Sequence, residues 1–267
     1  MPFDAYLRRW NLAPDGEPLH TNSSDLLPVR FAGEPAMLKV ARIDEERVGN
    51  GLMVWWNGQG AARVLRHDEE AVLLERVEGD LSLADMVQAG QDDEASRILC
   101  GAVAVLHESR AQSWPDLPPL ERWFRSLEEM APQVGGVLSL ALETAQHLFR
   151  DPRDVRPLHG DLHHGNVLHS RERGWLAIDP KGLIGERGFD YANLFCNPDL
   201  NFAATPGRLA RQAFIVSESA GLDRRRLLQW IFAYAGLSAA WHLEDEEPNL
   251  ADHTVEIARI AAAELGF

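Results

Sequence analysis

A change of pattern early in the chain constrains its fold more than any other feature. The first part alternates short apolar runs with polar turns, as at 26–31 and 36–40, which is typical of antiparallel strands. One helical stretch, 44–56, lies among them, with Asp44 placed as its N-cap. From Gly79 onward the apolar residues recur at helical spacing. The sequence therefore predicts a small antiparallel sheet lobe with one helix, followed by a larger, mainly helical lobe.

The expected elements define an α+β chain with two lobes, 1–77 and 78–267. Besides the segments above, we expect strands at 61–65 and 71–75, helices at 92–106, 120–130 and 137–149, a hairpin of 167–169 with 175–179, and helices from 207 to 264. The most apolar stretch, 227–243, contains polar interruptions, whereas a membrane span needs ~20 predominantly apolar residues. This stretch is therefore predicted to be a buried core helix.

The charge balance narrows the class of partner. Lys plus Arg total 26 against 41 Asp plus Glu, so the formal net charge is −15. Nucleic acids are bound through lysine and arginine footprints, which a chain this acidic is poorly suited to supply. We expect a cationic small molecule as substrate, no nucleic-acid partner, and a monomer or weak dimer.

Cysteine usage and the N-terminal residues indicate the compartment. Cys100 and Cys196 lie inside apolar stretches and lack the spacing of a disulfide framework or a zinc site. The first residues, 1–4, do not show the basic and then apolar layout of a signal peptide. We therefore expect a cytoplasmic protein with no membrane partner.

The segment 159–167, His-Gly-Asp-Leu-His-His-Gly-Asn-Val, carries the strongest chemical signal. Transfer of a phosphoryl group needs a carboxylate beside the acceptor hydroxyl, and oxygen ligands for the divalent cation that holds the nucleotide phosphates. Asp161 and Asn166, on one tight loop, can supply the base and one metal ligand. Asp179, at the end of the next hairpin, can supply the second ligand. The order and spacing of these three residues predict a phosphotransferase site.

The same residues resemble the kinase-like aminoglycoside phosphotransferases, whose loop reads H-G-D-x-H-x-x-N before I-D. Within that family the chain is similar to the streptomycin 6-phosphotransferase and hydroxyurea phosphotransferase group. The supporting segments are 54–60, 158–164, 174–180, 182–186 and 237–241. The resemblance implies a two-lobed protein-kinase-like fold, ATP and Mg²⁺ as cofactors, and transfer of the γ-phosphate to a hydroxyl of a streptomycin-type aminoglycoside, which confers antibiotic resistance.

The resemblance also implies roles for individual residues. Lys39 matches the lysine that contacts the α- and β-phosphates, and Glu46 matches the acid that orients this lysine. Asp161 matches the catalytic base, while Asn166 and Asp179 match the magnesium ligands.

Two segments match the remaining nucleotide contacts, and two departures separate the chain from protein kinases. Glu75 and Val77 belong to the expected hinge for the adenine edge, and Ser23 and Ser24 to the expected phosphate-covering loop. This loop has no G-x-G-x-x-G, so serine hydroxyls and backbone N–H groups are expected to replace it. Gly160 stands where many protein kinases have an arginine, and no A-P-E segment follows. A constitutively folded small-molecule kinase is the simpler interpretation.

Two functions from other classes stay open at this point. His159, His163 and His164 could belong to a zinc-dependent hydrolase, although histidines that structure the loop are the simpler interpretation. A nucleotide-binding regulatory module without turnover is the other alternative. Loss of Lys39 or Asp161 would have indicated such a module, and both are present.

The acceptor site is the least defined part of the prediction, and its candidates are Asp190, Trp241, Glu244 and Asp245. Asp190 is expected to buttress the loop rather than to touch the substrate. The acidic run 244–247 is either a solvated helix end or a trap for the two guanidinium groups of streptomycin. We expect a cyclitol hydroxyl as the phosphate acceptor, with hydroxyurea, amino alcohols and polyols as alternatives.

Overall fold

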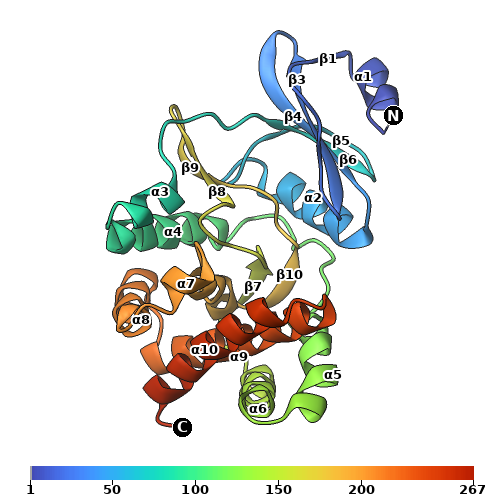
Figure 1. Cartoon of the computed structure of the whole chain (residues 1–267). Coiled ribbons are helices and arrows are strands. Elements are labelled where there is room, and N and C mark those ends of the chain that lie inside the picture. Colours follow the sequence, from blue (N-terminus) through green and yellow to red (C-terminus); the bar gives the residue numbers. More distant parts are fainter. Residues whose placement is uncertain (1) are drawn as a thin grey trace.

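The computed structural model describes residues 2–267, which form a smaller and a larger lobe (Figure 1). In the smaller lobe an antiparallel sheet has the strand order β1-β3-β4-β6-β5, and β2 pairs with β3 outside this path. The elements of this lobe are α1 (Asp4–Arg9), β1 (Leu12–Pro14), β2 (Leu19–His20), β3 (Ser24–Phe31), β4 (Glu34–Ala41), α2 (Asp44–Trp56), β5 (Val64–His67) and β6 (Ala71–Glu75). The predicted two-lobed α+β fold is confirmed, although α1 adds a second helix to the smaller lobe.

The sheet of the smaller lobe buries both of its faces, because successive side chains of a strand point to opposite sides. On β6, Leu73 packs with Leu38 in a core that also contains Phe3 and Tyr6 near α1. Its neighbour Val72 belongs to the other core, which includes α2 and extends into the larger lobe. The smaller lobe is therefore attached to the rest of the molecule through the α2 face of its sheet.

Helix α2 has the predicted bounds but not the predicted cap. Asp44 is its first residue and Ile43 occupies the N-cap position, so the expectation that Asp44 caps the helix is wrong. Asp44, Glu45 and Glu46 form an acidic first turn, which is favourable at the positive end of the helix dipole.

The predicted strand 61–65 begins later than expected, because its first residues pair with the larger lobe. Ala61 forms an isolated bridge with Ala177, and the N–H of Ala62 donates to the carbonyl of Ala177 at 2.9 Å. The strand β5 starts only at Val64. Residues 61 and 62 therefore connect the two lobes through backbone hydrogen bonds.

The larger lobe follows after residues 76–82, which form neither helix nor strand. Its elements are α3 (Leu83–Gln88), α4 (Asp92–Leu106), η1 (Leu120–Phe124), α5 (Arg125–Val134), α6 (Val137–Arg150), β7 (Val155–Leu158), β8 (Val167–Ser170), β9 (Gly174–Ala177), β10 (Leu183–Glu186), η2 (Arg187–Tyr191), η3 (Asn193–Cys196), α7 (Leu200–Ala203), α8 (Arg208–Ala220), α9 (Arg224–Glu244) and α10 (Pro248–Leu265). Most of α9 is buried, which confirms the predicted core helix. The pair β7–β10 was not predicted, because the catalytic loop and the β8–β9 hairpin separate its two short strands in the sequence, so no local turn joins them.

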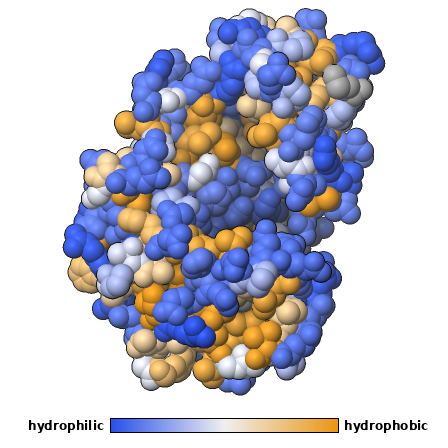
Figure 2. All heavy atoms as spheres, in the orientation of Figure 1, coloured by the Kyte–Doolittle hydropathy of each residue, from blue (hydrophilic) through white to orange (hydrophobic). Residues whose placement is uncertain are grey.

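Between the lobes the surface is hollowed, and hydrophilic residues line most of this hollow (Figure 2). Within residues 2–267, none of the helices combines the length and the apolar character needed to cross a bilayer.

Candidate active site

A short antiparallel hairpin brings the two predicted metal ligands together. Strands β8 and β9 pair in a register that places Val167 opposite Ala177. Directly beyond this pair, the N–H of Ile178 donates to the carbonyl of Asn166 at 2.9 Å. Asp179 is the next residue, and it adopts a left-handed backbone conformation (φ 60°). Two residues that are distant in the sequence therefore meet at one end of the hairpin.

The carboxylate of Asp161 is oriented by two asparagine amides. Asn193 Nδ2 donates to Asp161 Oδ1 at 2.9 Å. Asn166 Nδ2 donates to the backbone carbonyl of Asp161 at 2.9 Å and lies 3.4 Å from its Oδ2. Asn197 Nδ2 donates to Asn193 Oδ1 at 2.8 Å, which fixes the orientation of the Asn193 amide. A carboxylate held in this way can orient a hydroxyl group and accept its proton.

Asp190 lies beneath the catalytic loop, where it is 1% exposed. Its carboxylate accepts the N–H groups of His159 at 2.9 Å and Gly160 at 2.8 Å, and contacts His107 Nε2 at 2.9 Å. Burial would raise the pKa of Asp190, but the hydrogen bond and charge of His107 help to bring it below the ordinary value. A substrate contact for Asp190 is therefore wrong, and its position is that of a buttress for the backbone that leads into Asp161.

The three histidines of the loop have different environments. His159 is fully buried, burial lowers its pKa, and its Nε2 donates to the carbonyl of Ile178 at 2.8 Å. His164 is also buried, and burial lowers its pKa to about 3. His163 instead accepts a backbone N–H of its own loop at 3.0 Å. Residues 2–267 contain no cluster of three His, Cys, Asp or Glu that could hold a metal ion, so the zinc-hydrolase alternative has no ligand set there.

A charged cluster connects the smaller lobe to the metal ligands. Lys39, on β4, is 3% exposed and forms ion pairs with Glu46 of α2 and with Asp179. Lys181 Nζ donates to the other carboxylate oxygen of Glu46 at 2.8 Å. Burial acts to raise the pKa of both acids, but the charge of Lys39 and its hydrogen bonds hold the pKa of Glu46 and of Asp179 below the ordinary value. Both acids are therefore anions at neutral pH.

Helix α2 packs directly against the segment that follows Asp179. A Cβ atom at Gly49 would lie 1.8 Å from the carbonyl oxygen of Pro180, so only glycine permits this approach. A Cβ atom at Gly182, whose φ is +75°, would lie 3.0 Å from Val48 Cγ1. The helix that carries Glu46 is thus held against the metal-ligand segment by backbone packing as well as by charge.

The two serines of the predicted phosphate loop differ in accessibility. Ser24 is 3% exposed, and its hydroxyl lies 3.3 Å from Thr21 Oγ1 inside the turn. Its predicted role as a phosphate contact is therefore wrong for the side chain. Ser23 is half-buried, and its hydroxyl lies 3.5 Å from that of Thr21. A phosphate contact for Ser23 stays a prediction.

The two residues of the predicted hinge, Glu75 and Val77, differ in whether their backbone N–H groups are hydrogen-bonded. The Glu75 carboxylate accepts the N–H of Arg63 at 2.8 Å and forms an ion pair with Arg173. The N–H of Glu75 donates to the carbonyl of Arg63 at 2.9 Å. Among the described residues, by contrast, the N–H of Val77 has no hydrogen-bond partner. Val77 can therefore offer a free backbone donor to a planar heterocycle.

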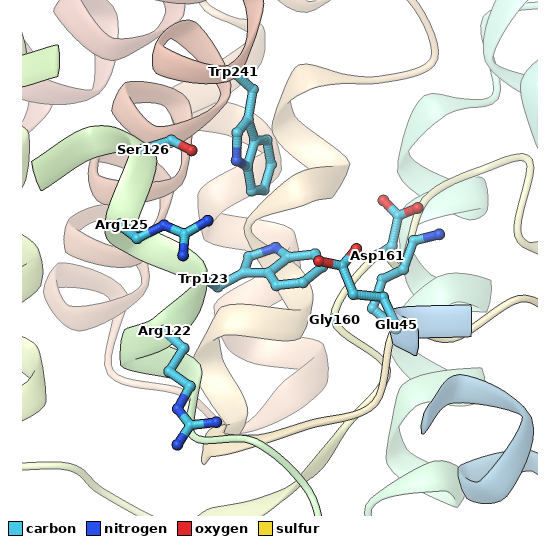
Figure 3. Close-up of a pocket in the computed structure, with 9 residues that line it drawn as sticks. Glu45, Arg122, Trp123, Arg125, Ser126, Gly160, Asp161 and Trp241 are labelled. Carbon is cyan, nitrogen blue, oxygen red and sulfur yellow. The ribbon is translucent and has the colours of Figure 1, made fainter. Parts of the chain in front are cut away.

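A cavity of about 290 Å³ opens beside Asp161 (Figure 3). It is lined by Glu45, Arg122, Trp123, Arg125, Ser126, Gly160, Asp161, Lys181 and Trp241. The rings of Trp123 and Trp241 meet edge to face, with centroids 5.8 Å apart and an interplanar angle of 84°. Figure 3 shows the Trp123 ring beside the Asp161 carboxylate, with Trp241 and Ser126 further from it. The base therefore shares its cavity with an aromatic wall.

The acidic run at the end of α9 does not line this cavity. Trp241 lines it as predicted, but Glu244 and Asp245 are exposed and lie outside it. Glu244 reaches the site only indirectly, by accepting the Ser126 hydroxyl at 2.8 Å. The prediction that Glu244 and Asp245 trap a cation in the site is therefore wrong in its location, since the lining acids come from α2 and the catalytic loop.

Several residues of the site were not predicted from the sequence, among them Asn193, Trp123 and Lys181. Asn193 orients the base and Trp123 forms part of the aromatic wall, but neither belongs to a recognisable spacing. The sequence does single out Lys181 in one respect, because the chain contains only one other lysine, Lys39.

The end of the β8–β9 hairpin fits a divalent cation. Among the described residues, Asn166 Oδ1 and Asp179 Oδ2 have no hydrogen-bond partner, while the other polar atom of each side chain is engaged. Amide and carboxylate oxygens are ligands that Mg²⁺ prefers, and this ion usually completes its shell with water and substrate phosphates. Both residues are therefore suited to the metal role that the sequence predicted.

The fold and this site together define a small-molecule phosphotransferase of the protein-kinase-like class. The model of the aminoglycoside/hydroxyurea antibiotic resistance kinase family matches residues 9–246. The chain belongs to this family, which confirms the resemblance seen in its sequence.

Several relatives match over nearly the whole chain. A streptomycin 3''-kinase from Klebsiella pneumoniae is 50% identical over 262 residues, covering 96% of this chain and 98% of the relative. A streptomycin 6-kinase from Streptomyces griseus is 34% identical, with 95% and 86% covered. A hydroxyurea phosphotransferase from Kitasatospora aureofaciens is 32% identical, with 98% and 78% covered.

Solved structures of low sequence identity share the fold. The aminoglycoside phosphotransferase APH(4)-Ia, in a ternary complex with AMP-PNP and hygromycin B, has a TM-score of 0.71 at 14% identity, with 98% of each chain covered. An ethanolamine kinase from Plasmodium vivax has a TM-score of 0.64 at 13% identity, covering 97% of this chain and 83% of that chain.

Proposed function

We propose that the protein is an ATP-dependent kinase that phosphorylates a hydroxyl group of streptomycin. One observation carries the kinase assignment, namely that Lys39, Asp179, Asn166 and Asp161 lie side by side, and that Asp161 faces an open cavity. The choice of streptomycin rests on the full-length identity of 50% to a streptomycin kinase. The regulatory-module alternative is disfavoured, because the base, the lysine and both metal ligands are present in one site.

In the proposed mechanism, each charged residue has one task. Lys39, oriented by Glu46, binds the α- and β-phosphates. Asn166 and Asp179 would hold Mg²⁺, which would neutralise phosphate charge. The Asp161 carboxylate orients the acceptor hydroxyl and takes its proton as the oxygen attacks the γ-phosphorus. The bond from this phosphorus to the bridging oxygen breaks, and its electron pair stays on ADP.

The nucleotide is proposed to lie between the lobes, whose boundary we place after Val77. The free N–H of this residue would bind the adenine edge, and the turn containing Ser23 would cover the phosphates. No glycine-rich loop is needed if the backbone N–H groups of the turn supply the donors.

The acceptor hydroxyl is proposed to be the 3'' one. The chain is 50% identical to the streptomycin 3''-kinase but 34% identical to the 6-kinase. This comparison favours a hydroxyl of the amino-sugar ring over the cyclitol hydroxyl expected from the sequence. The Trp123 and Trp241 wall beside Asp161 offers an apolar surface to the face of a sugar ring.

The test is an acceptor screen with purified protein and MgATP. Streptomycin, hydroxyurea, amino alcohols and neutral polyols are compared, and ³¹P–¹H correlation spectra of the product locate the phosphate. We expect one phosphate per ATP consumed, on the 3''-oxygen of streptomycin, and turnover reduced by about 10²–10⁴-fold in Asp161→Asn. Turnover of neutral acceptors without streptomycin would reject the substrate but retain the kinase, whereas ATP cleavage without any acceptor would reject the kinase.

A further inference from the structure

The chain contains only two lysines, Lys39 and Lys181, among 26 basic residues, and both bind the same carboxylate, that of Glu46. Everywhere else this chain uses arginine for positive charge. We infer that Lys181 is a further catalytic residue, which donates a hydrogen bond to the γ-phosphoryl group as that group is transferred. This inference rests on the proposed function.

The position of Lys181 satisfies the geometric requirement for this role. Its backbone N–H donates to the carbonyl of His159 at 2.8 Å, and a Cβ atom at Gly160 would lie 3.3 Å from Lys181 Cβ. The Lys181 side chain thus runs alongside the catalytic loop and lines the same cavity as Asp161. The γ-phosphoryl group must lie between the metal ligands and this base, which is the space next to Lys181.

The other cations of the cavity are placed differently. Arg122 and Arg125 lie on η1 and α5, and both are exposed. Arg125 has only a long contact with Glu129, at 3.8 Å, and neither arginine contacts the charged cluster of Lys39, Glu46 and Asp179 within the described residues. Lys181 is therefore the lining cation that is fixed with respect to the nucleotide end of the site.

An ammonium group suits this position better than a guanidinium. Lysine has a compact charge with three donor hydrogens that can rotate, whereas arginine presents a rigid planar fork. One hydrogen of Lys181 is used by Glu46 Oε1 at 2.8 Å, and the other two can reach an approaching oxygen. Charge spreads over the non-bridging oxygens of the γ-phosphoryl group in the transition state, where a fixed cation is most effective.

In the phosphoryl-transfer step, Lys181 stays protonated throughout, and all bonds, electron pairs and protons are accounted for without it. The acceptor oxygen forms a bond to the γ-phosphorus and loses its proton to Asp161. The bond from phosphorus to the bridging oxygen breaks, with the electron pair left on ADP. Lys181 only exchanges hydrogen-bond partners, so no proton, oxidant or further reactant is required.

A purely structural role for Lys181 makes a different prediction. If Lys181 served only to hold Glu46, its loss would misplace Lys39 and weaken binding of any nucleotide. If Lys181 binds the transferred phosphoryl group, its loss weakens only complexes that mimic the transition state of the transfer. MgADP with aluminium fluoride provides such a mimic, and MgADP alone is the matched reference.

The experiment measures both affinities, in the presence of streptomycin, for the wild type, Lys181→Met and Lys181→Arg. For Lys181→Met we expect MgADP affinity within about twofold of the wild type, with kcat and the aluminium fluoride complex each weakened by about 10²–10³-fold, the range for loss of one transition-state donor. For Lys181→Arg, kcat and the affinity of the aluminium fluoride complex should lie between those of the wild type and of Lys181→Met. Arg259→Met, which removes an exposed arginine of α10 outside the cavity, should leave both nucleotide affinities unchanged.

Selective ¹⁵N labelling of lysine provides a direct signature, because the chain has only two side-chain ammonium signals to resolve. Lys181→Arg assigns them. MgADP should shift the Lys39 signal, and aluminium fluoride should then shift that of Lys181. Equal losses of both affinities in Lys181→Met, or an unmoved Lys181 signal, would overturn the inference while the proposed function stands. Failure of the wild type to bind MgADP would reject both.

Discussion

The two walls of the candidate active site are built in different ways. The catalytic wall consists of two groups of bonded side chains, Lys39 with Glu46 and Asp179, and Asp161 with Asn166, and of these Asp161 lines the cavity. The acceptor wall consists of residues from two helical segments and α9, namely Arg122, Trp123, Arg125, Ser126 and Trp241. Lys39 and Glu46 are nearly fully buried, whereas Arg122 and Arg125 are exposed.

This difference matches the different demands on the two walls. The catalytic wall must hold charges in place before the reaction, because electrostatic stabilisation of a transition state works best when no reorganisation is needed. The acceptor wall must admit a particular molecule, and indole faces with exposed arginines can adapt to its shape. Two of the relatives are named for different acceptors, streptomycin and hydroxyurea.

The largest effect is expected for the catalytic wall at Asp161. Asp161→Asn keeps the size of the side chain but cannot accept the acceptor proton, so kcat should fall by about 10²–10⁴-fold. Affinity for MgADP should be nearly unchanged, as measured by calorimetry. Asp116→Asn, an exposed aspartate of a surface loop, is the matched control and should retain full activity. Wild-type kcat in Asp161→Asn would show that the base lies elsewhere.

The next largest effect is expected at Asp179, the proposed metal ligand. Asp179→Asn replaces an anionic oxygen by a neutral one, so nucleotide affinity with magnesium should fall by about tenfold or more, which is 1.4 kcal/mol. The difference from the wild type should shrink when magnesium is removed with a chelator. Asp245→Asn makes the same change in charge at an exposed position outside the cavity and should not alter the magnesium dependence. An unchanged magnesium dependence in Asp179→Asn would reject the ligand role.

The contrast between the walls also explains what the sequence could predict. Asp161 and Asn166 lie on one loop, and Asp179 is brought to them by a short hairpin whose strands were visible in the sequence. Local spacing was therefore sufficient to group these three residues of the catalytic wall. Lys39 and Glu46 needed the family resemblance, because their pairing joins a strand to a helix.

The acceptor wall depends on tertiary packing, which local spacing does not encode. Trp123 and Trp241 meet only after the segment η1–α5 packs beside α9, so the sequence predicted Trp241 without its partner. The acidic run after Trp241 was predicted in the site because it is near in sequence, but the helix end carries it away from the cavity. For a similar reason α1 and the pair β7–β10 were missed, since short elements are defined by what they pack against.

A smaller effect is expected at the aromatic part of the acceptor wall. Trp241→Leu keeps an apolar side chain but removes the indole face, whose contact with a sugar or a cation is worth about 0.5–2 kcal/mol. The KM for streptomycin should therefore rise by about 2–30-fold, with the KM for ATP nearly unchanged. Trp114→Leu, at a 47% exposed position outside the cavity, is the matched control. A loss of kcat for every acceptor would instead mean that Trp241 supports the catalytic wall.

The smallest effect is expected at the acidic run, where the double variant Glu244→Gln with Asp245→Asn removes two charges. Both residues are exposed and outside the cavity, so solvent and salt screen their attraction for a cationic acceptor. Glutamine at position 244 can still accept the Ser126 hydroxyl. We therefore expect the KM for streptomycin to change by less than about fivefold, since exposed ion pairs contribute about 0–1 kcal/mol.

The comparison variant for this prediction is Glu45→Gln, which removes a single charge from inside the cavity. It should raise the KM for streptomycin more than the double variant does, because Glu45 lines the cavity whereas Glu244 and Asp245 lie outside it. Since Glu45 is also exposed, the difference should shrink at high salt. The KM for neutral acceptors should respond to neither change. If the double variant had the larger effect, the acidic run would belong to the acceptor wall, and the conclusion that Glu244 and Asp245 lie outside the acceptor site would be wrong.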